Sequence, residues 1–283
     1  MTDTSKGPAL GRVYGQILSL FKKHPLLFLP FILAIVIDAG FFSLILLAPQ
    51  YPFSLVLAPI VRAFWGEQFL HYPANLFLAP QIFTYARYVI SITFGIILSG
   101  LAVSLIQQAY VHESLSVWTG LSKAVRRYLR LIVIWLITFA VMYLAIKVPT
   151  ILPVVSGIPL AVFTLKFLVT VVVQAFFVAA VPAVIIENKK ISGAFVRAMA
   201  MVKRYPFLLF FSVFIPSVLF LPMTAIAVKM SYIIERSSPD ALAYVVYLRI
   251  VVTAVVDLLV TAAASLILLM HREAFDAPNG GAR

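Results

Sequence analysis

The sequence predicts an all-α protein, a polytopic transmembrane bundle of six helices built as three repeats of an interfacial helix plus a transmembrane hairpin. Three observations support this fold class. Hydrophobic residues occupy 63% of the 283 positions and charged residues only 11%, whereas soluble domains are roughly half apolar and a quarter charged. Long apolar runs recur along the chain, giving a mean hydropathy of +1.06. A motif with two adjacent basic residues precedes every second run.

Each membrane crossing needs about 20 apolar residues in a helix. Six runs meet this length: Pro25–Ala48, Ala86–Tyr110, Leu129–Val148, Leu160–Ile186, Pro206–Met230 and Tyr244–Met270. The first is longer than a signal-peptide core of about 7 to 15 residues, so we expect it to be retained. The proline-containing segment Pro49–Tyr85 is predicted to form short helices that lie on the outer surface or are partly re-entrant. We expect kinks at Pro216 and Pro222 in the fifth span, and at Pro182 near the end of the fourth.

Lys and Arg gather in the N-terminus, in two connecting loops and in the C-terminus. Because short cytoplasmic loops carry the excess of these residues, the pattern predicts a multi-pass protein of a cell inner (cytoplasmic) membrane with both termini in the cytoplasm. The formal charge of +12 is thus assigned to topology and anionic lipids, and nucleic acid is not expected as a partner. The polar tail, residues 271–283, is predicted to be disordered.

A short motif marks a threefold repeat. It consists of an apolar residue, two bases, a ring-bearing residue and the first residue of an odd-numbered span, and it occurs at Phe21–Pro25, Val125–Leu129 and Val202–Pro206. An amphipathic stretch precedes or overlaps each copy: Val13–Phe21, Val117–Val125 and Ala194–Val202. We therefore predict one membrane domain, 1–270, with repeats at 11–110, 113–187 and 190–270.

The paired bases of the motif are candidates for contacts with lipid head groups: Lys22, Lys23, Arg126, Arg127, Lys203 and Arg204. An amphipathic helix lying flat places its bases among anionic head groups, and each base contributes about 1 kcal/mol there. Two interpretations remain open. The bases are topology anchors only, or they capture head groups or dock a partner protein.

The stretch Pro182–Pro206, PAVIIENKKISGAFVRAMAMVKRYP, resembles a group of bacterial six-helix membrane proteins that includes the membrane domain of some glycerophosphoryl diester phosphodiesterases. The shared pattern is a proline-containing helix end, an acidic residue and a small-residue amphipathic helix that ends in bases. The resemblance covers mainly residues 118–270, and Ala200 and Met201 replace the Ser-Trp pair frequent in that group. It implies a bacterial inner-membrane protein connected with lipids. It implies no reaction, since the sequence has no counterpart of the phosphodiesterase domain.

Ionisable residues within spans cost about 2.5 to 3.5 kcal/mol on insertion scales, so each is a candidate site. Asp38 and Asp257 lie near the middle of the first and sixth spans, with Gln174 and Ser99 at similar depth. These four residues would form a polar layer if their helices face one interior. The layer could act as a relay or binding site, or its groups could serve as hydrogen-bonded packing contacts.

A second set lies nearer the outer face. Lys166 and Arg249 each precede a midplane residue by eight positions, about 12 Å along a helix, and Arg87 occupies the matching place in the first repeat. These bases could extend to outer-leaflet phosphates. Alternatively, Lys166 or Arg249 binds an anionic head group, or pairs with Asp38 or Asp257. Candidate substrate or lipid contacts are thus Asp38, Gln174, Asp257, Lys166 and Arg249.

Motifs typical of catalysis are missing from the sequence. It has no phosphate-binding glycine loop, no histidine pair at zinc spacing, no G-x-S-x-G turn and no cysteine. We therefore predict no enzymatic activity, no cofactor and no metal. Two functional hypotheses remain. The protein binds, transports or senses lipid-like amphipathic molecules, or it is a structural or assembly subunit of a larger membrane complex.

Overall fold

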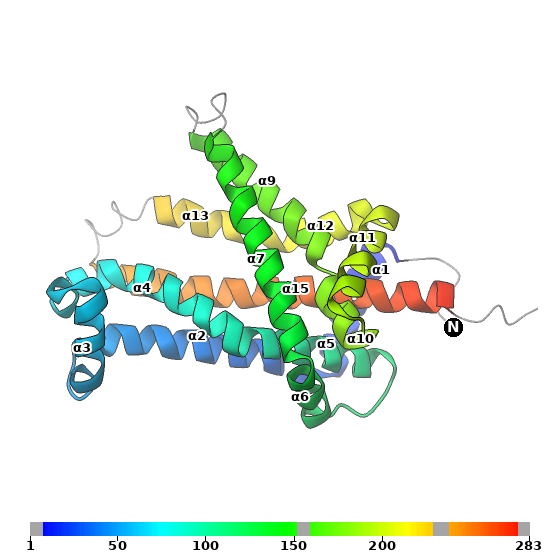
Figure 1. The fold of residues 1–283 in the computed structure, drawn as a ribbon, viewed down its shortest axis with the longest axis horizontal. Helices are drawn as coiled ribbons and strands as arrows, with labels where there is room; N and C mark the ends of the chain where they lie inside the picture. The colour runs from blue at the N-terminus through cyan, green and yellow to red at the C-terminus, as the bar shows by residue number, and fades with distance from the viewer. Residues whose placement is uncertain (1–7, 152–158, 229–237, 277–283) are drawn as a thin grey trace, which may run out of the picture. The chain divides into compact units, whose positions relative to one another are not determined.

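The computed structural model describes residues 8–151, 159–228 and 238–276, and every regular element within these ranges is helical (Figure 1). The elements are α1 (Leu10–Lys23), η1 (Pro25–Phe28), α2 (Leu29–Leu47), α3 (Ser54–Trp65), η2 (Glu67–Leu70), α4 (Ala74–Ile90), η3 (Ser91–Gly95), α5 (Ile96–Tyr110), α6 (Val117–Arg126), α7 (Tyr128–Ile151), α9 (Pro159–Phe177), α10 (Ala180–Ile186), α11 (Ile191–Arg204), α12 (Pro206–Ser217), α13 (Phe220–Val228) and α15 (Ala241–Asp276). The predicted all-α fold is confirmed.

Six helical stretches of the described chain are long and apolar enough to cross a membrane. They are Pro25–Leu47, Ala74–Tyr110, Tyr128–Val148, Ala161–Ile186, Pro206–Ile226 and Ala241–Ala274. Their number and order agree with the prediction. Many large apolar side chains on α2 and α7 are exposed, as expected of helix surfaces that lipid covers.

Each of the three predicted amphipathic stretches is a separate helix, and each leads directly into an odd-numbered span. Helix α1 precedes η1 and α2, α6 precedes α7, and α11 precedes α12. The second and fourth spans end with the same backbone conformation. His112 follows α5 and Asn188 follows α10, and both have left-handed φ angles, of 60° and 53°. Among non-glycine residues, Asn and His are enriched in this region of φ.

The three amphipathic helices pack one face against the protein, which the sequence analysis did not foresee. The buried face is Val13, Ile17 and Phe21 in α1, Gly120 and Ala124 in α6, and Ala194, Ala198 and Met201 in α11. Small residues allow α6 to approach α5 closely. A Cβ added to Gly120 would lie 2.8 Å from Leu101 Cδ1, and one added to Gly100 would lie 2.9 Å from Ala124 Cβ. These helices are therefore fixed parts of the fold.

Prolines lie close to interruptions in the fourth and fifth spans. Proline lacks the N–H that would bond the carbonyl four residues earlier. For Pro182 that carbonyl belongs to Val178, and the fourth span is broken between Phe177 and Ala180. For Pro222 it belongs to Val218, where α12 has ended and α13 has not begun. These interruptions lie near two of the three prolines at which kinks were predicted, whereas α12 continues through the third, Pro216, to Ser217.

Two boundaries differ from the prediction. The second span begins at Ala74 instead of Ala86, because helix α4 continues through Pro80; transmembrane helices tolerate such prolines. Helix α15 continues to Asp276, six residues into the tail that was predicted to be disordered. His271 is buried and its Nδ1 lies 3.3 Å from the hydroxyl of Tyr205, so packing extends the helix. Residues 277–283 lie outside the described ranges.

The chain divides into two compact units. Unit 1 contains Met1–Pro30, Ile96–Ser217 and Asp257–Arg283, and unit 2 contains Phe31–Gly95 and Val218–Val256. The core of unit 1 is formed by the corresponding ends of the three returning spans: Gly100–Ile106 in α5, all of α10 except Val181, and residues 262–270 in α15. The core of unit 2 contains Phe42, Phe69, Ala79, Phe83 and Ile250.

Candidate functional site

The predicted midplane and outer residues divide between the two units. Asp38 and Arg249 belong to unit 2, whereas Lys166, Gln174 and Asp257 belong to unit 1. Because these residues belong to two separate units, the polar layer across all spans stays a prediction. Gln174 and Lys166 are half-buried, and Asp257 and Ser99 are exposed.

Unit 2 brings three charged side chains together, which we call the charged cluster. Asp38 in the middle of α2 forms an ion pair with Arg87 near the end of α4, with 3.3 Å between Oδ2 and Nε. Their side chains are 14% and 27% exposed, respectively. Arg249 of α15 lies close enough to Arg87 for their positive charges to repel each other. The cluster thus contains one carboxylate and two guanidinium groups.

Sequence reasoning assigned Arg87 to an outer basic belt and did not pair it with Asp38. The error follows from the misplaced start of the second span. With the helix beginning at Ala74, Arg87 lies 13 residues inside it, about 20 Å along its axis. The proposed partners of Asp38 were Lys166 and Arg249, and the structure pairs it with Arg87 instead.

Aromatic packing one helical turn from the cluster holds its three helices together. Phe42 follows Asp38 by four residues, and its ring contacts Phe83 at 5.2 Å and Tyr247 at 5.1 Å between centroids. The hydroxyls of Ser43 and Tyr247 are 2.7 Å apart and hydrogen-bonded. Because these contacts join α2, α4 and α15, they fix the backbones that carry the charged groups.

In unit 1 the bases predicted to contact head groups differ in their surroundings. Arg127 Nη1 donates hydrogen bonds to the carbonyl oxygens of Val184, at 2.7 Å, and of Ile185. These carbonyls belong to the last turn of α10, where helices lack intrahelical donors. Arg127 is therefore a structural residue that caps α10. The other five are exposed: Lys22, Lys23, Arg126, Lys203 and Arg204.

Further contacts near Arg127 tie α6 and α7 to their neighbours. Lys123 Nζ donates to Gln107 Oε1 at 2.6 Å, and Arg130 Nη1 donates to Asn188 Oδ1 at 3.2 Å. Burial lowers the pKa of Lys123, repulsion from Arg127 lowers it further, and Glu113 opposes both effects. Only part of this basic region is thus available to bind a ligand.

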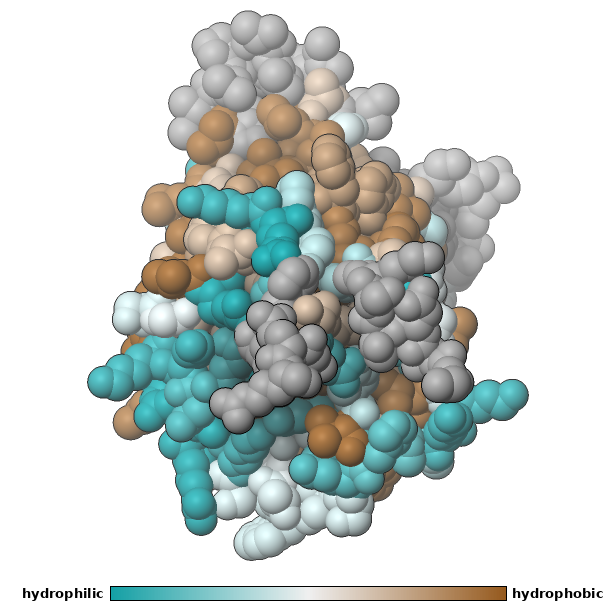
Figure 2. Space-filling view, turned by 90° about the vertical axis from the view of Figure 1, so that its right-hand side faces the viewer, coloured by the Kyte–Doolittle hydropathy of each residue, from teal (hydrophilic) through white to brown (hydrophobic). Residues whose placement is uncertain are grey.

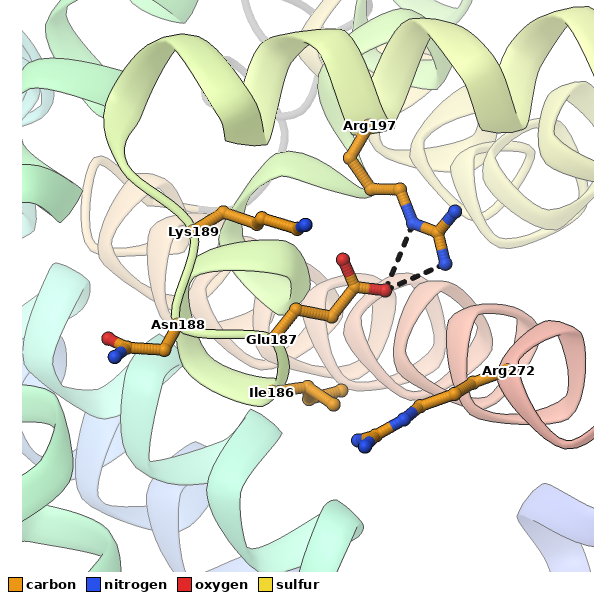
Figure 3. Close-up of a pocket in the computed structure, with 6 residues that line it drawn as sticks. All are labelled: Ile186, Glu187, Asn188, Lys189, Arg197 and Arg272. Carbon is orange, nitrogen blue, oxygen red and sulfur yellow. Dashed lines mark hydrogen bonds and ion pairs between the residues drawn. The ribbon is translucent and has the colours of Figure 1, made fainter. Parts of the chain in front are cut away.

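Two cavities open among the described residues of unit 1. The first, of about 370 Å³, is lined by Ile186, Glu187, Asn188, Lys189, Arg197 and Arg272, and we call it the Glu187 pocket (Figure 3). The second, of about 390 Å³, is lined by Trp118, Thr119, Ser122, Lys123, Arg126 and Arg127. Figure 2 views the molecule from the side of α10 and α11, and hydrophilic side chains gather on this face. Both cavities carry more basic than acidic groups.

The six helices that are long and apolar enough to cross a membrane indicate an integral, multi-pass membrane protein. Comparison with known protein families, with curated proteins and with solved structures finds no match to this chain. The resemblance of residues 118–270 to the six-helix bacterial group therefore stays a prediction.

Proposed function

We propose that this protein binds lipid-like amphipathic molecules at the charged cluster of unit 2, in order to transport or sense them. The observation that carries the proposal is the excess of guanidinium over carboxylate groups in Asp38, Arg87 and Arg249. The Asp38–Arg87 pair neutralises one positive charge. A second positive charge, on Arg249, is left within a membrane span, where a charge is costly.

An anionic head group would neutralise this excess. A guanidinium group binds phosphate and carboxylate through paired N–H donors, so Arg249 suits either anion. The side chain of Arg249 is exposed on α15, and the exposed residues Leu248, Val251 and Val255 form an apolar stripe on another side of the same helix. Acyl chains of a bound molecule would pack along this apolar surface. The exposed bases of unit 1 support the same association with anionic lipids.

The proposal places the protein in an inner membrane with its basic amphipathic helices on the cytoplasmic side, as the positive-inside rule predicts. It includes no catalytic step, cofactor or metal.

Native mass spectrometry of the full chain in mild detergent tests the proposed site. After incubation with phosphatidylglycerol, the wild type is expected to retain more lipid than after incubation with phosphatidylcholine. Arg249→Gln should lose this preference. Arg62→Gln is the matched control, since Arg62 also belongs to unit 2 and pairs with Glu67 on the surface, with both side chains 57% exposed.

Two results would contradict the proposal. One is an unchanged preference for phosphatidylglycerol in Arg249→Gln, and the other is an equal loss in Arg62→Gln. If the wild type retains no lipid and migrates with other membrane proteins at fixed stoichiometry, the alternative function, a structural or assembly subunit, replaces the first.

A further inference from the structure

The Glu187 pocket lies in unit 1 and uses none of the residues assigned to the charged cluster. Four of its lining residues, Ile186 to Lys189, come from the end of α10 and the loop before α11. Arg197 comes from α11 and Arg272 from α15 (Figure 3). Three separate elements therefore direct side chains to one cavity.

Two contacts fix the pocket's geometry. Glu187 Oε1 accepts hydrogen bonds from Arg197 Nε at 3.0 Å and Nη2 at 2.8 Å. These side chains are 10% and 22% exposed, respectively, so the pair is mostly shielded from water. Arg130 bonds the side chain of Asn188 at 3.2 Å, which holds the loop that carries Lys189. The pocket is thus organised before any ligand binds.

The charges of the pocket are unbalanced. Its lining has three basic groups and one carboxylate, and the carboxylate is occupied by Arg197. The side chains of Lys189 and Arg272 are exposed and have no hydrogen bond or ion pair with residues 8–148, 161–226 and 238–274, whose side chains the structure describes. In Figure 3, Lys189 extends toward the Glu187 carboxylate and Arg272 extends from α15 toward Ile186. Lys189 and Arg272 are therefore available to an anion.

We propose that the Glu187 pocket binds a phosphate group. A phosphate has several strong acceptor oxygens and can bind an ammonium and a guanidinium group at the same time, which suits Lys189 and Arg272. Arg197 contributes a third positive charge from a position fixed by Glu187. The volume of about 370 Å³ lies in the range of small-molecule sites. The phosphate belongs either to a lipid head group or to a soluble molecule.

Two binding measurements on the purified full chain in neutral detergent distinguish these sources. Isothermal titration with inorganic phosphate reports a soluble anion. Native mass spectrometry after incubation with phosphatidic acid, compared with phosphatidylcholine, reports a lipid head group. The pocket variant is the double substitution Lys189→Gln and Arg272→Gln. The control is Lys147→Gln and Lys190→Gln, which removes two exposed charges of unit 1 that do not line the pocket.

We expect the pocket variant to weaken binding at least about tenfold in one or both measurements, as for loss of charged hydrogen bonds, and the control to change it less than about twofold. Binding of phosphate alone assigns a soluble ligand, and binding of phosphatidic acid alone assigns a head group. The proposal is overturned if the wild type binds neither probe. It is also overturned if the control weakens binding as much as the pocket variant, because a diffuse positive surface would then explain the result.

Discussion

Arg126 and Arg127 are adjacent, equally charged residues of one sequence motif, and the structure gives them different roles. Arg126 is exposed, whereas Arg127 bonds the carbonyls of Val184 and Ile185, whose residues are fully buried. Arg127→Met and Arg126→Met each remove one positive charge from the junction between α6 and α7. Only Arg127→Met should leave the end of α10 without its donors.

The expected loss of stability follows from these two bonds. A hydrogen bond from a charged donor contributes about 1.5 to 3 kcal/mol. Both bonds come from a single nitrogen on a half-buried side chain, so we take the lower end for each bond, about 3 kcal/mol in total. With a shift of about 2 to 4 °C per kcal/mol for a domain of this size, Tm should fall by about 6 to 12 °C. Arg126→Met should stay within about 0.5 kcal/mol of the wild type.

Melting temperatures of the variants, measured in one detergent and monitored by fluorescence-detected size-exclusion chromatography, report this difference in stability. Arg127→Lys adds a second comparison, because it keeps the charge but loses the guanidinium geometry and should recover only part of the stability. The reasoning is refuted if Arg127→Met melts together with Arg126→Met, whether both are stable or both are destabilised.

Two further pairs of substitutions test other contacts. Gly100→Ala should destabilise unit 1 by about 1 to 3 kcal/mol, because its Cβ would lie 2.9 Å from Ala124 Cβ. Gly15→Ala has open space around it and should stabilise α1 by about 0.5 to 1 kcal/mol. Equal melting temperatures of these two variants would contradict the close packing of Gly100. Asp38→Asn should lower the free energy of unfolding by about 3 to 5 kcal/mol, because it leaves the mostly buried charge of Arg87 unpaired. In a double-mutant cycle, adding Arg87→Gln should restore part of that loss. Additive effects of the two substitutions would show that the two groups do not interact.

The number and order of the spans and the places of the amphipathic helices could be predicted from the sequence, because both depend on local patterns. Apolar runs of sufficient length define spans, and the paired bases mark where each odd-numbered span begins. Interruptions at Pro182 and Pro222 were also predictable, since a proline removes a bond within its own helix.

The charged cluster could not be predicted in full because it depends on contacts between distant segments. The segment Pro49–Tyr85 was predicted to lie outside the second span, whereas α4 begins at Ala74 and continues through Pro80. This error moved Arg87 to the edge of its span. The different roles of Arg126 and Arg127 were equally hidden. Sequence shows two identical charges, and only the position of α10 decides which one finds a carbonyl. His271 likewise reads as the start of a polar tail until Tyr205 is placed beside it.

Cysteine labelling tests most directly whether the chain crosses the membrane six times with its basic helices on one side. The sequence contains no cysteine, so single substitutions at exposed positions can be read without background. Lys22→Cys, Arg126→Cys and Lys190→Cys should react with a membrane-impermeant maleimide only from the cytoplasmic side, and Glu67→Cys only from the opposite side. Reaction of any two of the first three from opposite sides would contradict the arrangement.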